Sequence, residues 1–148
     1  MAKEMNNRIF ISFEGLESPD WLEGTESFVL AILEKLKKHN WDLSIFFCNN
    51  KIIQKLNKQY RNLDESTDVL SFIMAETAEG RFLPGDIVIS VEKAEENAQD
   101  FGVSPAEELQ RLLIHGILHL TGMDHASDEK DEPMLILQEQ LLKEIGPV

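Results

Sequence analysis

Three of the four histidines of the chain, His115, His119 and His125, fall within eleven residues. Histidines four residues apart on a helix share one face, about 6 Å apart along the axis. Gly122 can end that helix in a left-handed turn, after which the chain can fold back and aim the third imidazole at the same point. Three protein ligands with a fourth position left open are typical of a catalytic zinc site. The spacing therefore predicts one divalent ion per chain, with zinc first and nickel or another divalent transition metal as alternatives.

The residue after the first histidine indicates which hydrolytic chemistry this metal could serve. The spacing is similar to the zinc-binding segment of the metzincin peptidases, in which a glutamate at this point is the general base. The chain has Gly116 there, which carries no side chain. We therefore predict a metal-dependent hydrolase that is not an ordinary peptidase, and we expect a glutamate placed at 116 to add bulk outside the ligand set. Asp124 could act as a base, or it could be a turn residue after Gly122.

The same histidines could instead hold a metal for stability alone. Structural zinc sites usually complete the fourth position with a cysteine or a histidine. The single cysteine, Cys48, lies in an apolar run and is expected in the core, while His39 lies in a lysine-rich helix end. Neither residue is an obvious fourth ligand, so the sequence favours an open, catalytic position.

A helix with clear start and stop signals must carry His115 and His119. Ser104 is a cap residue, Pro105 suits the first helical position, and Glu107 completes a capping box. The glycine that follows the second histidine by three residues stops the helix. An apolar stripe is expected to face the core, formed by Leu109, Leu112, Leu113, Gly116 and Leu120.

The other segments predict a sheet with helices packed on it. Alternating and β-branched runs predict strands over residues 8–13, 41–48, 68–74 and 85–90. Helical spacing and cap residues predict helices over about 19–40, after Asn49, over 91–101, over 104–122 and from about 131 to 146. The ten residues 75–84 allow an antiparallel return between the last two strands. This order predicts an α+β fold with a small mixed sheet, in one domain over residues 1–148.

The distribution of charge bears on the partners of the protein. A formal net charge of −13 argues against nucleic-acid binding by the molecule as a whole, because phosphate contacts require lysine and arginine. Between Lys51 and Arg61, however, the chain has four basic residues and no acidic one. Lys51, Lys55 and Lys58 recur at helical spacing, and they form either a solvated helix face or a track for an RNA backbone.

The compartment can also be predicted from the composition. A single cysteine excludes an intrachain disulfide and fits a reducing compartment. The first seven residues have no apolar signal core, and the longest apolar run, Phe28 to Leu33, is too short to span a bilayer. We therefore expect a cytoplasmic protein with no membrane partner.

Three segments, Leu56–Phe72, Gly85–Ser90 and His115–His125, carry a resemblance to the YbeY family of bacterial endoribonucleases, also called rRNA maturation factors. Together with the length and the order of elements, the resemblance covers nearly the whole chain. Ile73 stands where the family usually has a proline. We expect this difference to change the exit of the strand slightly and to leave the chemistry untouched.

The resemblance implies a metal-dependent, single-strand-specific endoribonuclease that acts in 16S rRNA 3′-end maturation and in ribosome quality control. It also implies a mixed four-stranded sheet with a metzincin-like metal-binding helix and turn. The three metal ligands of the family map onto His115, His119 and His125, and its essential arginine maps onto Arg61. The implied partners are single-stranded RNA, namely the 16S rRNA precursor, and the ribosome or ribosomal proteins, with no DNA expected.

The sequence leaves the roles of several candidate site residues open between two alternatives. Arg61 could stabilise negative charge on phosphoryl oxygens, or it could form a surface salt bridge with Asp64 or Glu65. Asp68 and Ser71 could contact the site, although Asp68 is more typical of a loop end. No general base is evident, so a metal-activated water and the 2′-OH of the substrate are two routes to the nucleophile. Rival functions are a ribosome assembly factor with a structural metal and a metallopeptidase or other small-molecule hydrolase.

Overall fold

Alternating apolar residues form the strands, and amphipathic segments between them form the helices. The computed structural model describes residues 6–123 and 133–146. The elements are β1 (Arg8–Phe13), a short 3-10 helix (Asp20–Leu22), α1 (Thr25–Lys35), β2 (Asp42–Cys48), α2 (Asn50–Arg61), β3 (Val69–Ala78), β4 (Arg81–Ser90), α3 (Val91–Phe101), α4 (Pro105–Leu120) and α5 (Pro133–Ile145). The predicted order of strands and helices is confirmed.

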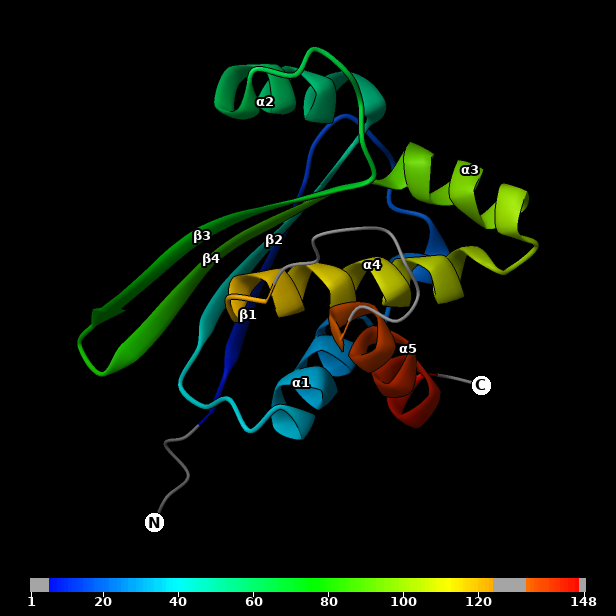
Figure 1. The fold of residues 1–148 in the computed structure, drawn as a ribbon. Coiled ribbons are helices and arrows are strands. Elements are labelled where there is room, and N and C mark those ends of the chain that lie inside the picture. Colours follow the sequence, from blue (N-terminus) through cyan, green and yellow to red (C-terminus); the bar gives the residue numbers. More distant parts are fainter. Residues whose placement is uncertain (1–5, 124–132, 147–148) are drawn as a thin grey trace.

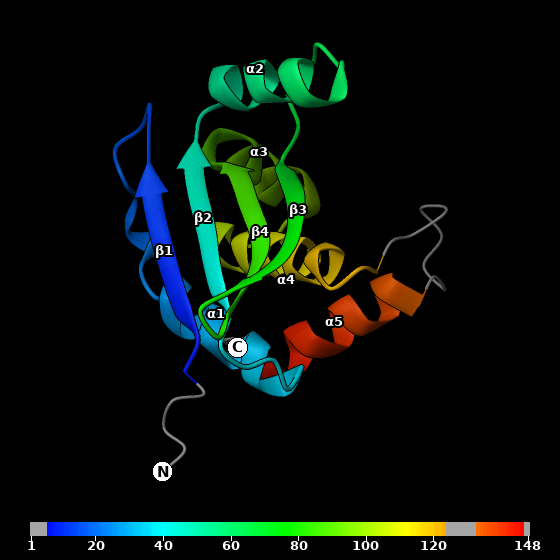
Figure 2. The same ribbon diagram turned by 90° about the vertical axis from the view of Figure 1, so that its left-hand side faces the viewer.

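The sheet has the strand order β1-β2-β4-β3, so β3 is an edge strand. β1, β2 and β4 run parallel, and β3 pairs antiparallel with β4. Figure 2 looks onto this sheet, with α1, α4 and α5 behind it and α2 across its upper end. The α+β fold with a mixed four-stranded sheet is therefore confirmed.

The core lies between the sheet and the helices on one of its faces, chiefly α1 and α4 (Figure 1). Ile45 and Ile87 of the sheet and Leu113 and Ile117 of α4 are fully buried there. A smaller apolar cluster on the other face includes Cys48, whose burial raises the pKa of its thiol to about 12. Cys48 is thus a core residue, as predicted. None of the described helices has the length and apolar character needed to cross a bilayer.

The cap at Ser104 and the stop at Gly122 act as the sequence predicts, whereas Glu107 does not close the expected capping box onto the Ser104 amide. The Ser104 hydroxyl accepts a hydrogen bond from the Glu107 amide at 3.1 Å. Gly122, with φ of +98°, donates its amide to the carbonyl of His119 at 3.0 Å, and Met123 donates to Leu118 at 3.2 Å. These bonds satisfy backbone groups that the helix ends leave unpaired. The carboxylate of Glu107 accepts from Arg111 at 3.2 Å.

Two segments differ from the expectations. The helix predicted over 19–40 divides into the 3-10 helix and α1, because the chain takes a left-handed conformation at Gly24, where φ is +85°. The return predicted over residues 75–84 belongs mostly to the strands. β3 and β4 extend as far as a two-residue turn at Glu79 and Gly80, where φ is positive at both positions, as in a type I′ hairpin. The hairpin is therefore longer than the hydrophobic pattern indicates.

Candidate functional site

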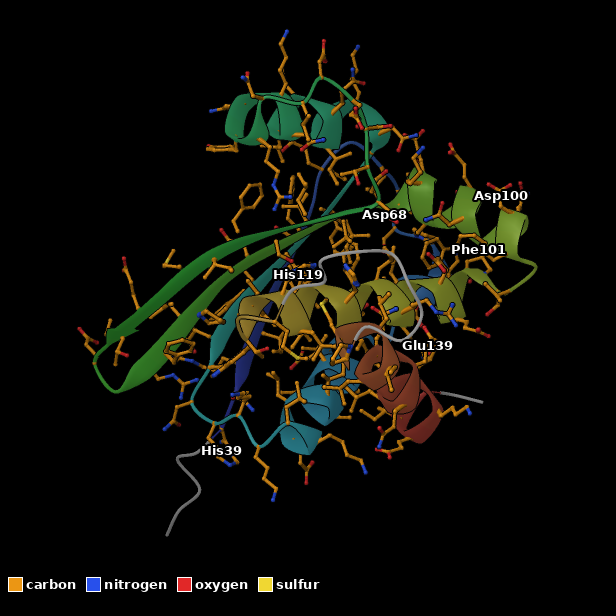
Figure 3. The ribbon with its side chains drawn as sticks, viewed as in Figure 1. His39, Asp68, Asp100, Phe101, His119 and Glu139 are labelled. Carbon is orange, nitrogen blue, oxygen red and sulfur yellow. The ribbon has the colours of Figure 1, made fainter. Side chains whose placement is uncertain are left out.

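His115 and His119 lie one turn apart on α4, and their side chains converge. Their Nε2 atoms are 3.1 Å apart, and their ring centroids are 4.6 Å apart. Both side chains are partly buried. Figure 3 shows His119 where α4 passes beneath the β3–β4 hairpin, whereas His39 lies far away near the start of β2. The predicted pairing of these two histidines on one helix face is confirmed, and His39 has no place in the group.

The convergence fits a divalent transition metal. Two imidazole nitrogens that bind one tetrahedral zinc ion at about 2.0–2.1 Å lie roughly 3.3 Å apart. The observed 3.1 Å between the two Nε2 atoms is close to that spacing. The third predicted ligand, His125, lies outside the described residues, as does Asp124. Within residues 6–123 and 133–146, no group of three or more potential metal-binding side chains occurs, so the structure describes two of the three predicted ligands.

Gly116 allows α4 to lie close against the sheet. A Cβ atom added there would be 3.1 to 3.3 Å from three side-chain atoms of Ile87, which is tighter than ordinary packing contact. Residue 116 thus faces the sheet, while the flanking His115 turns its ring toward His119. A glutamate at this position would add its bulk outside the ligand pair, as expected, but that bulk would press directly on Ile87 in the core.

Arg61 reaches the histidines from the opposite face of the sheet. It is the last residue of α2, and its guanidinium donates to the backbone carbonyl of Ser71 in β3 at 3.0 Å. The guanidinium carbon also lies 5.9 Å from the centre of the Phe72 ring, a cation–π distance. In the described part of the chain it forms no ion pair with Asp64 or Glu65. The alternative of a surface salt bridge is therefore not what the structure shows.

A small cavity joins these groups. Arg61, His115 and His119 line a space of about 140 Å³, together with residues of β3 that face α4, namely Val69, Ser71 and Ile73. None of the described lining residues carries a carboxylate. Ile73 was expected to leave the chemistry untouched, but it lines the cavity beside both histidines, because β3 continues through it. Ser71 is also a lining residue, as the sequence allowed.

Gln138, which sequence reasoning did not identify, contacts the ring nitrogen of His115 that does not point at His119. Gln138 of α5 is 7% exposed, and its Oε1 atom lies 2.7 Å from Nδ1 of His115. The adjacent Glu139 receives two hydrogen bonds from Arg111 of α4, at 2.9 and 3.2 Å, and these lower the pKa of its carboxyl group. One signal was available, since Gln138 occupies a core position in the apolar repeat of α5 between Met134 and Leu141.

Asp68 ends the loop before β3, as expected. Its carboxylate accepts from the Val69 amide at 2.7 Å and from the Asn97 side chain at 3.1 Å, and the latter also donates to buried Glu108 at 3.3 Å. This chain of bonds connects the start of β3 to α3 and α4. Asp68 therefore fixes the strand that carries Ser71 and does not line the cavity.

The lysines of α2 form an exposed stripe that leads toward Arg61. Lys51, Lys55 and Lys58 are all exposed, while Ile53 on the opposite side is buried. Lys58 lies 3.9 Å from Asp64, a loose contact between side chains that are both more than 60% exposed. Such a pair contributes little to stability. The structure thus confirms the helical spacing of the lysines, while their contact with RNA stays a prediction.

Comparison with known proteins shows close relatives over most of the chain. Residues 12–146 match the family described as Endoribonuclease YbeY. The endoribonuclease YbeY of Treponema denticola is 46% identical over 145 residues, which cover 93% of this chain and 93% of that protein. The endoribonuclease YbeY of Borrelia duttonii is 45% identical over 134 residues, covering 88% of this chain and 90% of that protein.

A solved structure has a similar fold. The solution structure of TM1509 from Thermotoga maritima aligns with a TM-score of 0.66 at 31% sequence identity, covering 93% of this chain and 88% of that chain. The family match includes both histidines of α4, Arg61 and all of β3. On this evidence, the chain belongs to the endoribonuclease YbeY family.

Proposed function

We propose that this protein is a metal-dependent endoribonuclease that cleaves single-stranded RNA. The observation that carries the proposal is the meeting of His115, His119 and Arg61 at one cavity of about 140 Å³. Membership of the YbeY family supports RNA as the substrate. His125 is proposed as the third metal ligand on the sequence spacing, and zinc as the metal, with nickel or another divalent transition metal as alternatives.

The residues of the cavity suit phosphodiester cleavage. A divalent ion held by neutral imidazoles supplies Lewis-acid polarisation of a phosphoryl oxygen or activation of a water molecule. Arg61 would bind the non-bridging oxygens, on which negative charge grows as the bond breaks, through the N–H groups that Ser71 leaves unoccupied. Its contact with Phe72 holds the guanidinium in place without neutralising its charge. No described lining residue is a carboxylate, so no acid among them competes with the phosphate for Arg61.

The size and place of the cavity support a single-stranded substrate. A volume of about 140 Å³ admits a few water molecules or one small group, not a whole nucleotide. It is lined by residues of the edge strand β3 and of α4, so a phosphate that passes the edge of the sheet would reach it. A flexible strand can turn a phosphate inward, whereas a stacked duplex holds its phosphates on a rigid helix. The exposed lysines of α2 would then hold neighbouring phosphates.

In the cell, we propose that the substrate is the 3′ end of the 16S rRNA precursor, reached on or near the ribosome in the cytoplasm, with a further role in ribosome quality control. Family membership supports this assignment. Cells depleted of the protein should accumulate 16S rRNA with an extended 3′ end. The native gene should restore the mature end, and a gene with Arg61→Ala should not. Restoration by Arg61→Ala would favour an assembly factor whose metal is structural.

A paired assay tests the biochemical proposal directly. Purified protein loaded with zinc is incubated with single-stranded RNA, with the same RNA annealed to its complement, with single-stranded DNA and with casein. We expect cleavage of the single-stranded RNA alone, lost in His119→Ala and kept in His39→Ala, which changes an exposed histidine outside the site. Cleavage of casein with intact RNA would instead support a metallopeptidase and contradict the proposal.

A further inference from the structure

We infer that Gln138 of α5 is a positioning residue that fixes the tautomer and the orientation of the metal ligand His115. The inference rests on the proposed metal site and adds to it a residue from a different helix. Gln138 is nearly fully buried, and its side-chain oxygen is 2.7 Å from Nδ1 of His115. Such partners of ligating histidines commonly determine which ring nitrogen faces the metal.

The neighbours of Gln138 determine which way its amide points. Its Nε2 atom donates to Oε2 of Glu139 at 3.2 Å. Glu139 is held by Arg111, which donates to both of its carboxylate oxygens, and an ionised carboxylate can only accept hydrogen bonds. Turning the amide over would place its oxygen against that carboxylate. The amide nitrogen therefore faces Glu139, and the amide oxygen faces His115.

This orientation determines the tautomer of His115. An amide oxygen can only accept, so the hydrogen in the 2.7 Å contact must be on Nδ1 of His115. In a neutral imidazole with its hydrogen on Nδ1, the lone pair is on Nε2. That Nε2 atom is the one that points at Nε2 of His119, 3.1 Å away. Gln138 thus leaves the nitrogen on the cavity side free of hydrogen, as a metal ligand requires.

A chain of hydrogen bonds links the guanidinium of Arg111, through Glu139 and Gln138, to the ring of His115. Arg111 and His115 are one turn apart on α4, and Glu139 and Gln138 are adjacent on α5, so the bonds close a loop between the two helices. Figure 3 shows Glu139 at the junction where α5 packs on α4. Rotation of the His115 ring would break the contact with Gln138. The same bonds therefore limit both the tautomer and the ring angle.

Zinc affinity tests the inference without any measurement of RNA cleavage. Gln138→Leu keeps the approximate size of the side chain and removes its acceptor. We expect its zinc affinity, measured by competition with a chromophoric chelator, to fall about 10- to 100-fold. Gln140→Leu is the matched control, because it makes the same change on the same helix at an exposed residue that bonds Glu144. Its zinc affinity should equal that of the native protein.

Gln138→Glu should rescue zinc binding, since a carboxylate also accepts from Nδ1 of His115. We expect its affinity to lie within a few-fold of the native value, although the new charge loses the bond to Glu139. A residue that only filled space would not distinguish Glu from Leu in this way. Equal zinc affinity of native protein and Gln138→Leu would overturn the inference.

A spectroscopic measurement on the native protein provides an independent test. Long-range proton–nitrogen NMR of the metal-free, histidine-labelled protein should show His115 with its hydrogen on Nδ1, since no bound metal dictates the tautomer there. A hydrogen on Nε2 would overturn the inference even if the Gln138→Leu variant failed to fold. Zinc affinity that depends on Gln138 in a protein that cleaves no RNA would refute the proposed function alone. RNA cleavage with zinc affinity that is independent of Gln138 would refute this inference alone.

Discussion

The hydroxyl of Ser71 donates to the backbone carbonyl of Gly116 at 3.2 Å, which ties the edge strand to the helix that carries both histidines. The backbone carbonyl of the same serine accepts from Arg61 at 3.0 Å. One residue of β3 therefore connects the helix of the imidazoles to the end of the helix that supplies the guanidinium. The relative position of these groups depends on short polar contacts with β3 in addition to the apolar core.

Arg61→Ala should reduce kcat for RNA cleavage by an amount on the order of 10²-fold, as for other donors that stabilise charge in a transition state. The RNA affinity should stay nearly unchanged, because an interaction made only in the transition state lowers kcat and kcat/KM together. Single-turnover kinetics and a binding titration measure the two effects. Lys58→Ala, three residues earlier on the exposed face of α2, is the contrasting variant, because it also removes one positive charge but should keep kcat and weaken RNA binding instead. Cleavage at the native rate would exclude a catalytic role for Arg61.

His119→Ala should lose most of the bound metal. The variant removes one of two nitrogens that lie 3.1 Å apart, so the remaining ligands no longer enclose the ion. Elemental analysis of protein purified without chelator should give nearly one metal ion per chain for the native protein and for His39→Ala. Unchanged metal content in His119→Ala would show that the ion binds elsewhere.

Gly116→Glu should lower the free energy of unfolding by about 1–3 kcal/mol, because the added atoms meet Ile87 in a packed core. Gly116→Ala should cost less, since it adds only one methyl group against Ile87, and the gain of about 1 kcal/mol of helix propensity over glycine offsets part of that crowding. Urea unfolding of Gly116→Ala, Ile87→Val and the double variant should show favourable coupling, as the smaller valine relieves the contact. Strict additivity would contradict this account of Gly116.

The native protein, which lacks a carboxylate at residue 116, should show negligible peptidase activity.

Replacing Lys51, Lys55 and Lys58 together by alanine should weaken RNA binding and flatten its dependence on salt. Each lost phosphate contact reduces the log–log slope by about 0.7 for a single strand, so all three should reduce it by about 2. A triple alanine variant at Lys35, Lys37 and Lys38 makes the same change of charge near the end of α1 and should keep the native slope. If the two triple variants behave alike, the stripe on α2 is only a solvated helix face.

The ionisation of Asp42 should make the free energy of unfolding depend on pH in the acid range. Hydrogen bonds from Arg8 and Arg81 lower the pKa of its carboxyl group from 3.8 to about 2. Since the folded pKa lies below the unfolded one, the stabilisation is present above about pH 4 and is lost as the pH falls toward 2. Asp42→Asn should therefore cost about 1 kcal/mol at pH 7, after allowance for solvent screening, and progressively less in acid. Urea unfolding across this pH range measures the difference, with Asp64→Asn as the exposed control.

The sequence predicts the elements near the site better than it predicts their contacts. Local signals are sufficient for α4, because its cap at Ser104 and its stop at Gly122 act within a few residues. The pairing of His115 with His119 follows from the same helical repeat. Gln138 is different, because its contact with His115 spans 23 residues and depends on how α5 packs on α4. A glutamine at a core position of a helix signals a buried partner without identifying it.

The length and edge position of β3 also could not be predicted from the sequence. Arg61 is the last residue of a regular amphipathic helix, and nothing local indicates that its guanidinium reaches the backbone of Ser71 in β3. The role of Ile73 was also missed, since the strand was expected to end near it, whereas β3 continues to Ala78. Both errors concern strand length and edge position, which depend on pairing with β4.

Because side chains alternate along β3, the site forms only when β3 pairs with β4 in the correct register. Val69, Ser71 and Ile73 face the histidines, while Leu70 and Phe72 pack on the α2 side. A slip of β3 by one residue against β4 would exchange these two sets, because side chains alternate between faces. The apolar cores could partly tolerate such an exchange, but Ser71 would leave α4 and Phe72 would enter the cavity. A molecule with this misregistered strand could stay compact and yet have no nuclease site, so only correctly paired molecules would be able to cut RNA.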